Sequence, residues 1–284
     1  MKVHKKIAIV TDSTCDLTEE VLNELNIHFL PLKIIYKDKE YMDRINITPE
    51  QVYEAFEKEI PTTSLPGVDE IKKKYLELKE EGYTHIIAIH ISGGLSSTVN
   101  ICKMVSNEIE GIEVEVIDSG MLSMVLGRLV LYARNLIDNQ KLSFSNIISK
   151  IRNKMDEINA YFVVSTLKYL VKGGRIGKVK GTLGELLNIK PIISINKDGE
   201  YYTFDKARSR KKSITRLYNI ALEKIQKGIC YVDVMHADAR EEAEKLYNRF
   251  KDLKTVKDSF LGEISPAMAV HAGPGLIGIC ISFV

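Results

Sequence analysis

The stretch HISGGLSSTVN at residues 90–100 joins an apolar run to a helix-like pattern, and it is rich in hydroxyl side chains and glycines. Ser92, Ser96 and Ser97 can all donate hydrogen bonds. A helix that begins here adds free backbone N–H groups and a partial positive charge, which favour a bound anion. Open parallel sheets also bind ligands at the carboxyl ends of their strands. The alternative is that one serine caps the helix and the glycines only form the turn.

Two more hydroxyl-rich segments lie nearer the N-terminus. The segment DST at residues 12–14 follows the first apolar run, and the segment TTS at residues 62–64 precedes a predicted helix. Loops that follow parallel strands converge on one edge of the sheet, so the three segments together predict a site for a small anion or for the anionic end of a larger ligand. For residues 62–64, helix capping with a proline turn is an equal alternative.

Basic side chains gather in two places. The segment KGGRIGKVKG at residues 172–181 contains Lys172 and Arg175, and it could bind phosphate or a partner protein. A solvated loop is the usual fate of such a run. The segment ARSRKK at residues 207–212 contains Arg208 and lies at a predicted helix start. Cations are slightly unfavourable there, which favours a functional role for this cluster.

A nucleophilic enzyme is a second possibility. Ser96 as nucleophile and His271 as base would suit an acyl hydrolase or transferase. Ser96 does not lie in a GxSxG elbow, however, and the sequence places no acid partner for His271. The other candidates, His85, His90 and His236, lack the spacing of metal ligands, and none of the four cysteines forms a CxxC pair, so we expect no metal site.

Two segments resemble nucleotide-binding motifs but lack the necessary context. GPGLIG at residues 273–278 matches GxGxxG, yet a terminal strand follows it where a helix is required. The segment around Gly177 and Lys178 fails as a GxxxxGK[ST] loop, because Lys172 stands where the first glycine belongs and Val179 follows the lysine. The sequence therefore predicts no ATP site and no nucleotide cofactor within the chain.

The composition excludes several classes of protein. The 284 residues suggest two domains, and 45% hydrophobic with 27% charged residues is ordinary for a globular protein. Forty basic against 38 acidic residues give a formal charge of +2, which disfavours a nucleic-acid regulator and an anionic membrane as partner. The most apolar stretch, residues 121–133, is broken by Arg128 and is shorter than the roughly 20 residues that span a bilayer. We expect a cytoplasmic protein with reduced thiols.

The first half of the chain alternates strand-like and helix-like segments, which predicts crossover connections and a mostly parallel sheet. Helix-start signals are present at two positions. Asp16 with Glu19 predicts one capping box, and Thr48 with Gln51 predicts another. The expected strands cover residues 6–10, 27–36, 84–91 and 112–118. The expected helices include residues 68–81, 95–109, 121–139 and 143–158.

The second half has an α+β pattern. A strand is expected at residues 160–166, and residues 190–204 predict a hairpin that turns at Asp198-Gly199. Further expected elements are helices at 211–227 and 238–253, and strands at 229–237 and 276–284. We therefore predict an α/β domain over residues 1–157, with a mostly parallel open sheet and flanking helices, and an α+β domain over residues 158–284.

The chain resembles the DegV family of fatty-acid-binding proteins from its first strand to its last. The stretches that carry the resemblance are VTDSTCDL at 10–17, TSLP at 63–66, ISGGLSST at 91–98, VIDS at 116–119, LVKGGRIG at 170–177 and HAGPG at 271–275. The resemblance implies two α/β domains with a long-chain fatty acid buried between them, and no catalysis by the chain. It also implies a separate kinase subunit that supplies the ATP site and phosphorylates the bound carboxylate to an acyl phosphate.

The resemblance also implies roles for individual residues. Thr63, Ser96 and His271 would bind the carboxylate. Arg175 would lie at the rim of the head group, and we expect Lys172 and Arg208 to join it in facing the kinase. Further candidates for the head-group loops are Thr62, Ser64, Ser97 and Ser119. This chain departs from the common family pattern at Gly67, Gly93 and Ser97, which leaves the three principal residues intact.

An uncharged cup rich in hydroxyls suits one carboxylate whose tail supplies the affinity. Burying ~14 methylenes at ~0.8 kcal/mol each gives about 11 kcal/mol before association costs. Each hydrogen bond to a charged head group contributes ~1.5–3 kcal/mol at best. The tail therefore holds the ligand, and the cup fixes its orientation.

Overall fold

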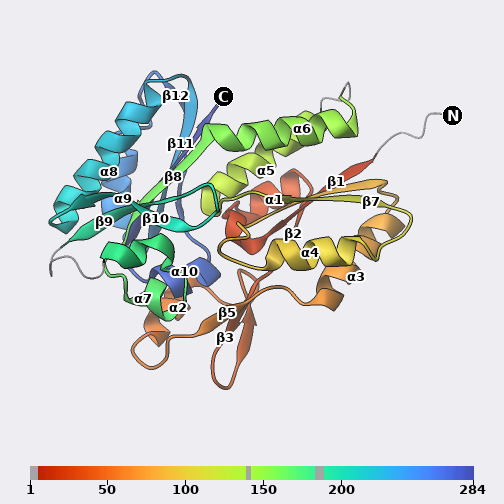
Figure 1. The fold of residues 1–284 in the computed structure, drawn as a ribbon, viewed down its shortest axis with the longest axis horizontal. Helices are drawn as coiled ribbons and strands as arrows, with labels where there is room; N and C mark the ends of the chain where they lie inside the picture. The colour runs from red at the N-terminus through yellow and green to blue at the C-terminus, as the bar shows by residue number, and fades with distance from the viewer. Residues whose placement is uncertain (1–5, 139–141, 183–188) are drawn as a thin grey trace. The chain divides into compact units, whose positions relative to one another are not determined.

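A computed structural model describes residues 6–138, 142–182 and 189–284, which form two compact units (Figure 1). The first unit comprises residues up to Lys33 and Ser64–Asp156, and the second comprises Ile34–Thr63 and Glu157–Val284. Each unit has its own sheet. The last residue of the helix predicted at 121–139 lies outside the described residues.

The first unit contains a four-stranded parallel sheet in the order β2-β1-β6-β7. Strand β6 is buried along its whole length, as expected for a parallel strand with helices on both faces. The predicted α/β architecture with a parallel sheet is confirmed. The four strands are β1 (Ile7–Asp12), β2 (Ile27–Leu30), β6 (His85–His90) and β7 (Glu113–Asp118).

Helices cover both faces of this sheet. On one face Val10, Ile86 and Ala88 pack in a cluster with Tyr75 of α3 and Val99 of α4. Figure 1 shows α3 and α4 on one side of β1 and β7, with α5 and α6 on the other. The helices of this unit are α1 (Glu19–Glu24), α3 (Val68–Glu80), α4 (Thr98–Ser106), α5 (Ser123–Asp138) and α6 (Phe144–Lys154), and η1 (Ser13–Cys15) is a 3-10 turn.

One predicted helix cap is wrong. Thr18, and not Asp16, caps α1, because its hydroxyl accepts the N–H of Val21. Asp16 instead adopts a left-handed backbone with φ of 54° at the end of η1, and its carboxylate accepts a hydrogen bond from Ser123. A residue in that conformation ends one turn and cannot also begin the next helix.

The second unit contains a seven-stranded mixed sheet in the order β10-β9-β8-β14-β11-β12, with β13 also paired to β11. The predicted hairpin is confirmed: β9 and β10 are antiparallel, and the turn between them closes with Gly199 donating to the carbonyl of Asn196. The strands are β8 (Ile158–Val163), β9 (Lys190–Ile195), β10 (Tyr201–Ala207), β11 (Cys230–Ala237), β12 (Val256–Asp258), β13 (Leu261–Glu263) and β14 (Leu276–Phe283).

Helices α8 and α9 cover one face of this sheet. Leu217 of α8 and Leu246 of α9 pack against Val232, Val234 and Ile279 of the central strands. The helices and 3-10 turns of the unit are α2 (Pro49–Ala55), η2 (Met155–Glu157, at the unit boundary), α7 (Lys168–Lys172), η3 (Gly177–Thr182), α8 (Arg210–Ile225), α9 (Arg240–Tyr247) and α10 (Pro266–Ala272).

Residues 34–63 group with the second unit, which differs from the predicted division at residue 157. The capping box of Thr48 and Gln51 begins α2 as predicted, and α2 packs against α10. Asp43 accepts the N–H of Ala267 at 2.9 Å, and Phe56 stacks on Tyr169 with ring centres 4.6 Å apart. These contacts with the C-terminal half, which local sequence patterns do not encode, explain the grouping.

The segment at residues 62–64 is a strand and not the predicted loop after a strand of the parallel sheet. It forms β5 (Thr62–Ser64) in a separate three-stranded sheet with β3 (Lys33–Ile35) and β4 (Glu40–Met42). Three hydroxyl-rich loops on one edge of the parallel sheet are therefore not present, although the loops after β1 and β6 do follow adjacent strands.

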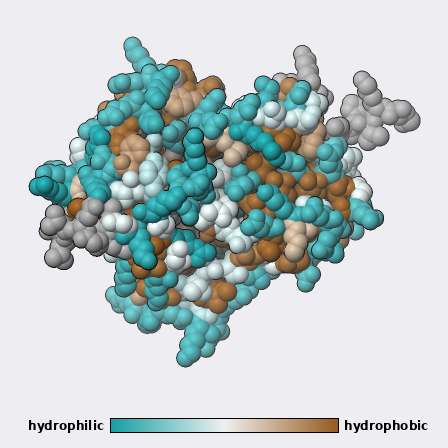
Figure 2. All heavy atoms as spheres, viewed as in Figure 1, coloured by the Kyte–Doolittle hydropathy of each residue, from teal (hydrophilic) through white to brown (hydrophobic). Residues whose placement is uncertain are grey.

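The surface mixes polar and apolar residues. Figure 2 shows hydrophobic residues gathered on the viewed face where Figure 1 places α4, and Met104 of that helix is 43% exposed. Across the described ranges, no helix combines the length and the apolar character that crossing a bilayer requires.

Candidate functional site

Two of the predicted carboxylate-binding residues are in direct contact within the second unit. The Oγ1 of Thr63, on β5, lies 2.7 Å from Nε2 of His271, on α10. Both side chains are partly buried. The pair presents a hydroxyl and an imidazole, and the charge that acts on this imidazole is the guanidinium of Arg175, which suits a bound anion.

The imidazole of His271 is held by the backbone around it. Helix α10 starts with Pro266 in its first turn and ends at Gly273, whose φ of 68° favours glycine. A Cβ on Gly173 would lie 2.1 Å from Nδ1 of His271, and a Cβ on Gly273 would lie 2.1 Å from the ring of Tyr169. These glycines are therefore required by close packing against the histidine and its neighbour.

His271 is neutral near pH 7. Burial lowers its pKa, the guanidinium charge of Arg175 lowers it further, and together they bring the pKa to about 4. The Nδ1 atom is buried and has no hydrogen-bond partner among the described residues. A Ser-His-Asp triad needs a carboxylate at that atom, so the geometry does not support His271 as the base of such a triad.

The predicted basic residues lie at different depths. Arg175 is half-buried and donates from Nη1 to the carbonyl of Gly173 at 2.6 Å, which places its charge near His271. Lys172, in the last turn of α7, and Arg208, before α8, are exposed. The neighbouring Arg210 has a structural role, since it pairs with Glu242 and donates to the carbonyl of Gly275.

In the first unit, the loop between β6 and α4 carries Ser96. Its Oγ lies 2.8 Å from Oγ1 of Thr98, and its N–H donates to the carbonyl of Ser92. Ser96 is half-buried. The helix starts at Thr98, three residues later than predicted, and Ser97 occupies the capping position without a capping hydrogen bond from its side chain.

Most other hydroxyls of this region satisfy the protein's own backbone. Ser119 is buried, and its Oγ both donates to the carbonyl and accepts from the N–H of Met121. Ser13 accepts from the N–H of Leu32, and Ser92 accepts from the N–H of Gly94. These groups shape the loops, whereas Ser97 is exposed.

The remaining predicted residues lie around β5. Thr62 is exposed and Ser64 is half-buried. Gly67 precedes α3, and its N–H donates to the carboxylate of Glu70 at 2.6 Å. Glu70 thus satisfies the N–H of the residue before the helix, and Gly67 offers no capping side chain of its own.

Sequence reasoning missed the buried carboxylate that organises the loop carrying Ser96. Asp12, at the end of β1, accepts from the N–H of Ile91 at 2.8 Å and lies 3.1 Å from Nδ1 of His90. Its other oxygen accepts from the N–H and the hydroxyl of Thr14. The sequence feature that indicates this role of Asp12 is a carboxylate at the end of a strand, directly before hydroxyl-rich residues.

His90 is fully buried beside Asp12. Burial opposes a charge on the ring, but the sulfur of Cys102 and the carboxylate of Asp12 raise the pKa of His90 to about 10. Asp12 and His90 therefore form a buried ion pair. Within the described residues there is no group of three or more histidine, cysteine or acidic side chains suited to a metal ion, and the four cysteines are buried thiols that form no disulfide.

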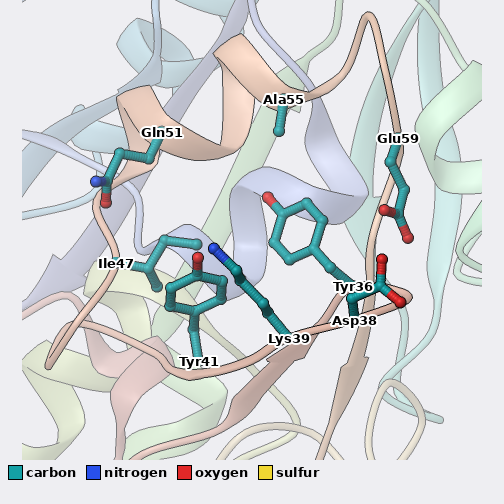
Figure 3. Close-up of a pocket in the computed structure, with 8 residues that line it drawn as sticks. All are labelled: Tyr36, Asp38, Lys39, Tyr41, Ile47, Gln51, Ala55 and Glu59. Atoms are coloured by element: carbon teal, nitrogen blue, oxygen red, sulfur yellow. The ribbon is translucent and has the colours of Figure 1, made fainter.

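A cavity of about 280 Å³ lies in the segment 34–63 (Figure 3). The rings of Tyr36 and Tyr41 meet edge to face with centres 5.8 Å apart. Asp38, Lys39 and Glu59 bring charged groups to the lining. Desolvating charges against an aliphatic chain is unfavourable, so this cavity does not suit an acyl tail. The other lining residues are Ile47, Gln51 and Ala55.

Comparisons with known proteins agree on one family. A model of the DegV family matches residues 6–284. A DegV domain-containing protein of Clostridium acetobutylicum is 45% identical over 278 residues, which cover 98% of this chain and 99% of that protein.

Solved structures show the same fold. The crystal structure of DegV, a fatty acid binding protein from Bacillus subtilis, is 32% identical with a TM-score of 0.91, over 99% of this chain and 100% of that one. A stearic acid-binding protein from Eubacterium ventriosum is 26% identical with a TM-score of 0.86, over 98% of each chain.

Proposed function

This chain belongs to the DegV family, and we propose that it is a carrier that binds one long-chain fatty acid by its carboxylate without acting on it. The observation that carries the proposal is the contact between Thr63 and a neutral, partly buried His271. The relatives from Bacillus subtilis and Eubacterium ventriosum, which bind fatty acids, support the ligand class.

The proton on His271 decides what Thr63 can offer to the ligand. A proton on Nδ1 would be a buried N–H without an acceptor, which is the rarer kind of unsatisfied group. We therefore place the proton on Nε2, where it is donated to Oγ1 of Thr63. The hydroxyl proton of Thr63 is then free for the ligand's carboxylate. Ser96 is proposed as a further donor to the same group.

The acyl tail and the carboxylate contribute different amounts to the free energy of binding. About 14 buried methylenes contribute about 11 kcal/mol before association costs. One hydrogen bond to the ionised carboxylate contributes ~1.5–3 kcal/mol. Loss of a hydroxyl should therefore weaken binding without abolishing it, whereas a short acyl chain should abolish it.

We further propose that a separate kinase subunit phosphorylates the bound acid. A carboxylate oxygen would attack the γ-phosphorus of ATP, and the bond to ADP would break, which leaves an acyl phosphate. The absence of a nucleotide motif from the sequence supports a second subunit as the source of ATP. Exposed Lys172 and Arg208, with Arg175, are the proposed contact residues. An Arg175→Ala variant that binds lipid and sustains full kinase turnover would contradict the role of Arg175.

Binding to delipidated protein tests the carrier function. We expect palmitate to bind, octanoate to bind far more weakly because its tail is short, and methyl palmitate to bind more weakly than palmitate because it lacks the carboxylate. Equal binding of the acid and its methyl ester would contradict carboxylate recognition. Turnover of acyl esters that is lost in Ser96→Ala would instead indicate the hydrolase or transferase.

A further inference from the structure

The loop that carries Ser96 is tied to the end of the neighbouring strand β7. Asp118, the last residue of β7, accepts the N–H of Gly93 at 3.1 Å on Oδ1 and 3.2 Å on Oδ2. The same Oδ1 accepts the N–H of Gly120 at 2.9 Å. One half-buried carboxylate thus bridges the backbones of two adjacent loops.

Backbone hydrogen bonds connect the segment bridged by Asp118 to Ser96. The N–H of Ser92 donates to the carbonyl of Met121 at 2.8 Å, and the carbonyl of Ser92 accepts the N–H of Ser96 at 3.0 Å. Gly93 lies between the two serines in this turn. A shift of Gly93 away from Asp118 would therefore change the orientation of the peptide that fixes Ser96.

Gly93 packs directly against the carboxylate of Asp118, so a larger residue at position 93 would require that carboxylate to shift. A Cβ at residue 93 would lie 2.6 Å from Oδ2 of Asp118, closer than real Cβ atoms approach a neighbour. The φ of Gly93 is not in the left-handed region, so a Cβ at this position would meet the Asp118 carboxylate without straining the backbone. A side chain at residue 93 and the carboxylate of Asp118 therefore compete for the same space.

We propose that Asp118 is a positioning residue for Ser96: its carboxylate holds the backbone of Gly93 and thereby sets the turn that presents the Ser96 hydroxyl to the ligand. The proposal rests on the proposed function, because it takes Ser96 as a ligand contact. Asp118 itself need not touch the ligand.

A double-mutant cycle on palmitate binding tests the pair. We expect Asp118→Ala and Gly93→Ala each to weaken binding about tenfold, the effect of losing one well-placed hydrogen bond to the ligand. The double variant should bind no worse than Asp118→Ala, because the added Cβ then meets no carboxylate. Additive losses, or wild-type affinity in Asp118→Ala, would overturn the proposal.

Two further variants separate positioning from folding. Asp118→Asn should keep part of the affinity, because one amide oxygen can accept from both Gly93 and Gly120, as Oδ1 does, while the amide NH2 in place of Oδ2 loses the second bond from Gly93. Glu113→Gln, at the other end of β7, is the matched control and should bind as the wild type does. An Asn variant as weak as the Ala variant would contradict the positioning role.

Amide hydrogen exchange in the ligand-free protein tests the positioning of Ser96 by Asp118 separately from fatty acid binding. Asp118→Ala should speed exchange at the N–H groups of Gly93 and Ser96, while the amides of β11 keep their wild-type rates. This readout needs no fatty acid, so it tests the positioning of the loop even if the wild-type protein fails to bind palmitate. Unchanged exchange at both amides would refute it.

Discussion

Thr63 and His271 are 208 positions apart in the sequence, yet Oγ1 of the threonine lies 2.7 Å from Nε2 of the histidine. The histidine is neutral, and its other nitrogen is buried without a hydrogen-bond partner in the described chain. This arrangement commits the imidazole to the threonine, and in the proposed function the threonine hydroxyl is the group that meets the ligand.

Replacing Thr63 with valine should weaken fatty acid binding about 10- to 100-fold, because one hydrogen bond to a charged group contributes ~1.5–3 kcal/mol. Thr63→Ser keeps the hydroxyl and is the matched control. Isothermal titration with palmitate measures both. Wild-type affinity in the valine variant would show that the hydroxyl does not bind the carboxylate.

The protonation of His271 should be visible by ¹⁵N NMR of its imidazole. We expect a neutral ring with the proton on Nε2 from pH 8 down to pH 5, since its pKa in the folded chain is about 4. A doubly protonated ring at pH 6, or a neutral ring protonated on Nδ1, would contradict the proposed hydrogen bond to Thr63.

His271 should also make the folded state less stable in acid. An unfolded chain protonates this histidine near 6.5 and the folded chain only near 4, so the unfolded state binds the extra proton between these values. The free energy of unfolding of the wild type should therefore fall relative to that of His271→Gln as the pH drops from 6.5 to 4. Urea denaturation across this range tests the sign, and a constant difference would contradict it.

Gly173→Ala should disturb the same contact from the opposite side of the ring. The new Cβ would lie 2.1 Å from Nδ1, so the imidazole has to move away from its place beside Thr63. Overpacking of this kind costs about 1–3 kcal/mol of stability, and palmitate affinity should fall as well. Gly181→Ala, whose new Cβ would meet no atom of the described residues within 4 Å, is the control. Equal palmitate affinity in the two variants would contradict the packing argument.

Local patterns predicted most of the elements. The capping box at Thr48 and the Asp198-Gly199 turn each depend on neighbouring residues, and both are present. The cap at Asp16 was wrong because Thr18 competes for the same helix start two residues later. Helix α10 was missed because it is seven residues long and almost wholly buried, so it shows no amphipathic period.

Tertiary contacts account for what the sequence could not predict. The spacing of residues gives no reason for β5 to leave the parallel sheet or for Thr63 to meet His271. Resemblance to a family selected these two residues, whereas the carboxylates of Asp12 and Asp118 became apparent only through their contacts with the loop between β6 and α4. Both carboxylates lie at strand ends, which is a local signal, but the loop that each of them holds is set by tertiary contacts.

Asp12→Ala should destabilise the first unit strongly. The change removes an acceptor for Ile91 and Thr14 and leaves His90 buried without its carboxylate. Breaking a buried charged pair typically costs about 3–5 kcal/mol. Urea denaturation measures the loss, and Asp38→Ala, an exposed aspartate, is the control. A loss below ~1 kcal/mol would show that the Asp12–His90 pair contributes little to stability.

The central claim is that the chain carries a fatty acid, and denaturing extraction of the purified protein followed by mass spectrometry tests it most directly. We expect one long-chain fatty acid per chain in the extract, and its mass would identify the preferred acyl length and unsaturation. An extract without lipid, from protein that also fails to take up added palmitate, would contradict the claim and leave Ser96 as a possible nucleophile to test.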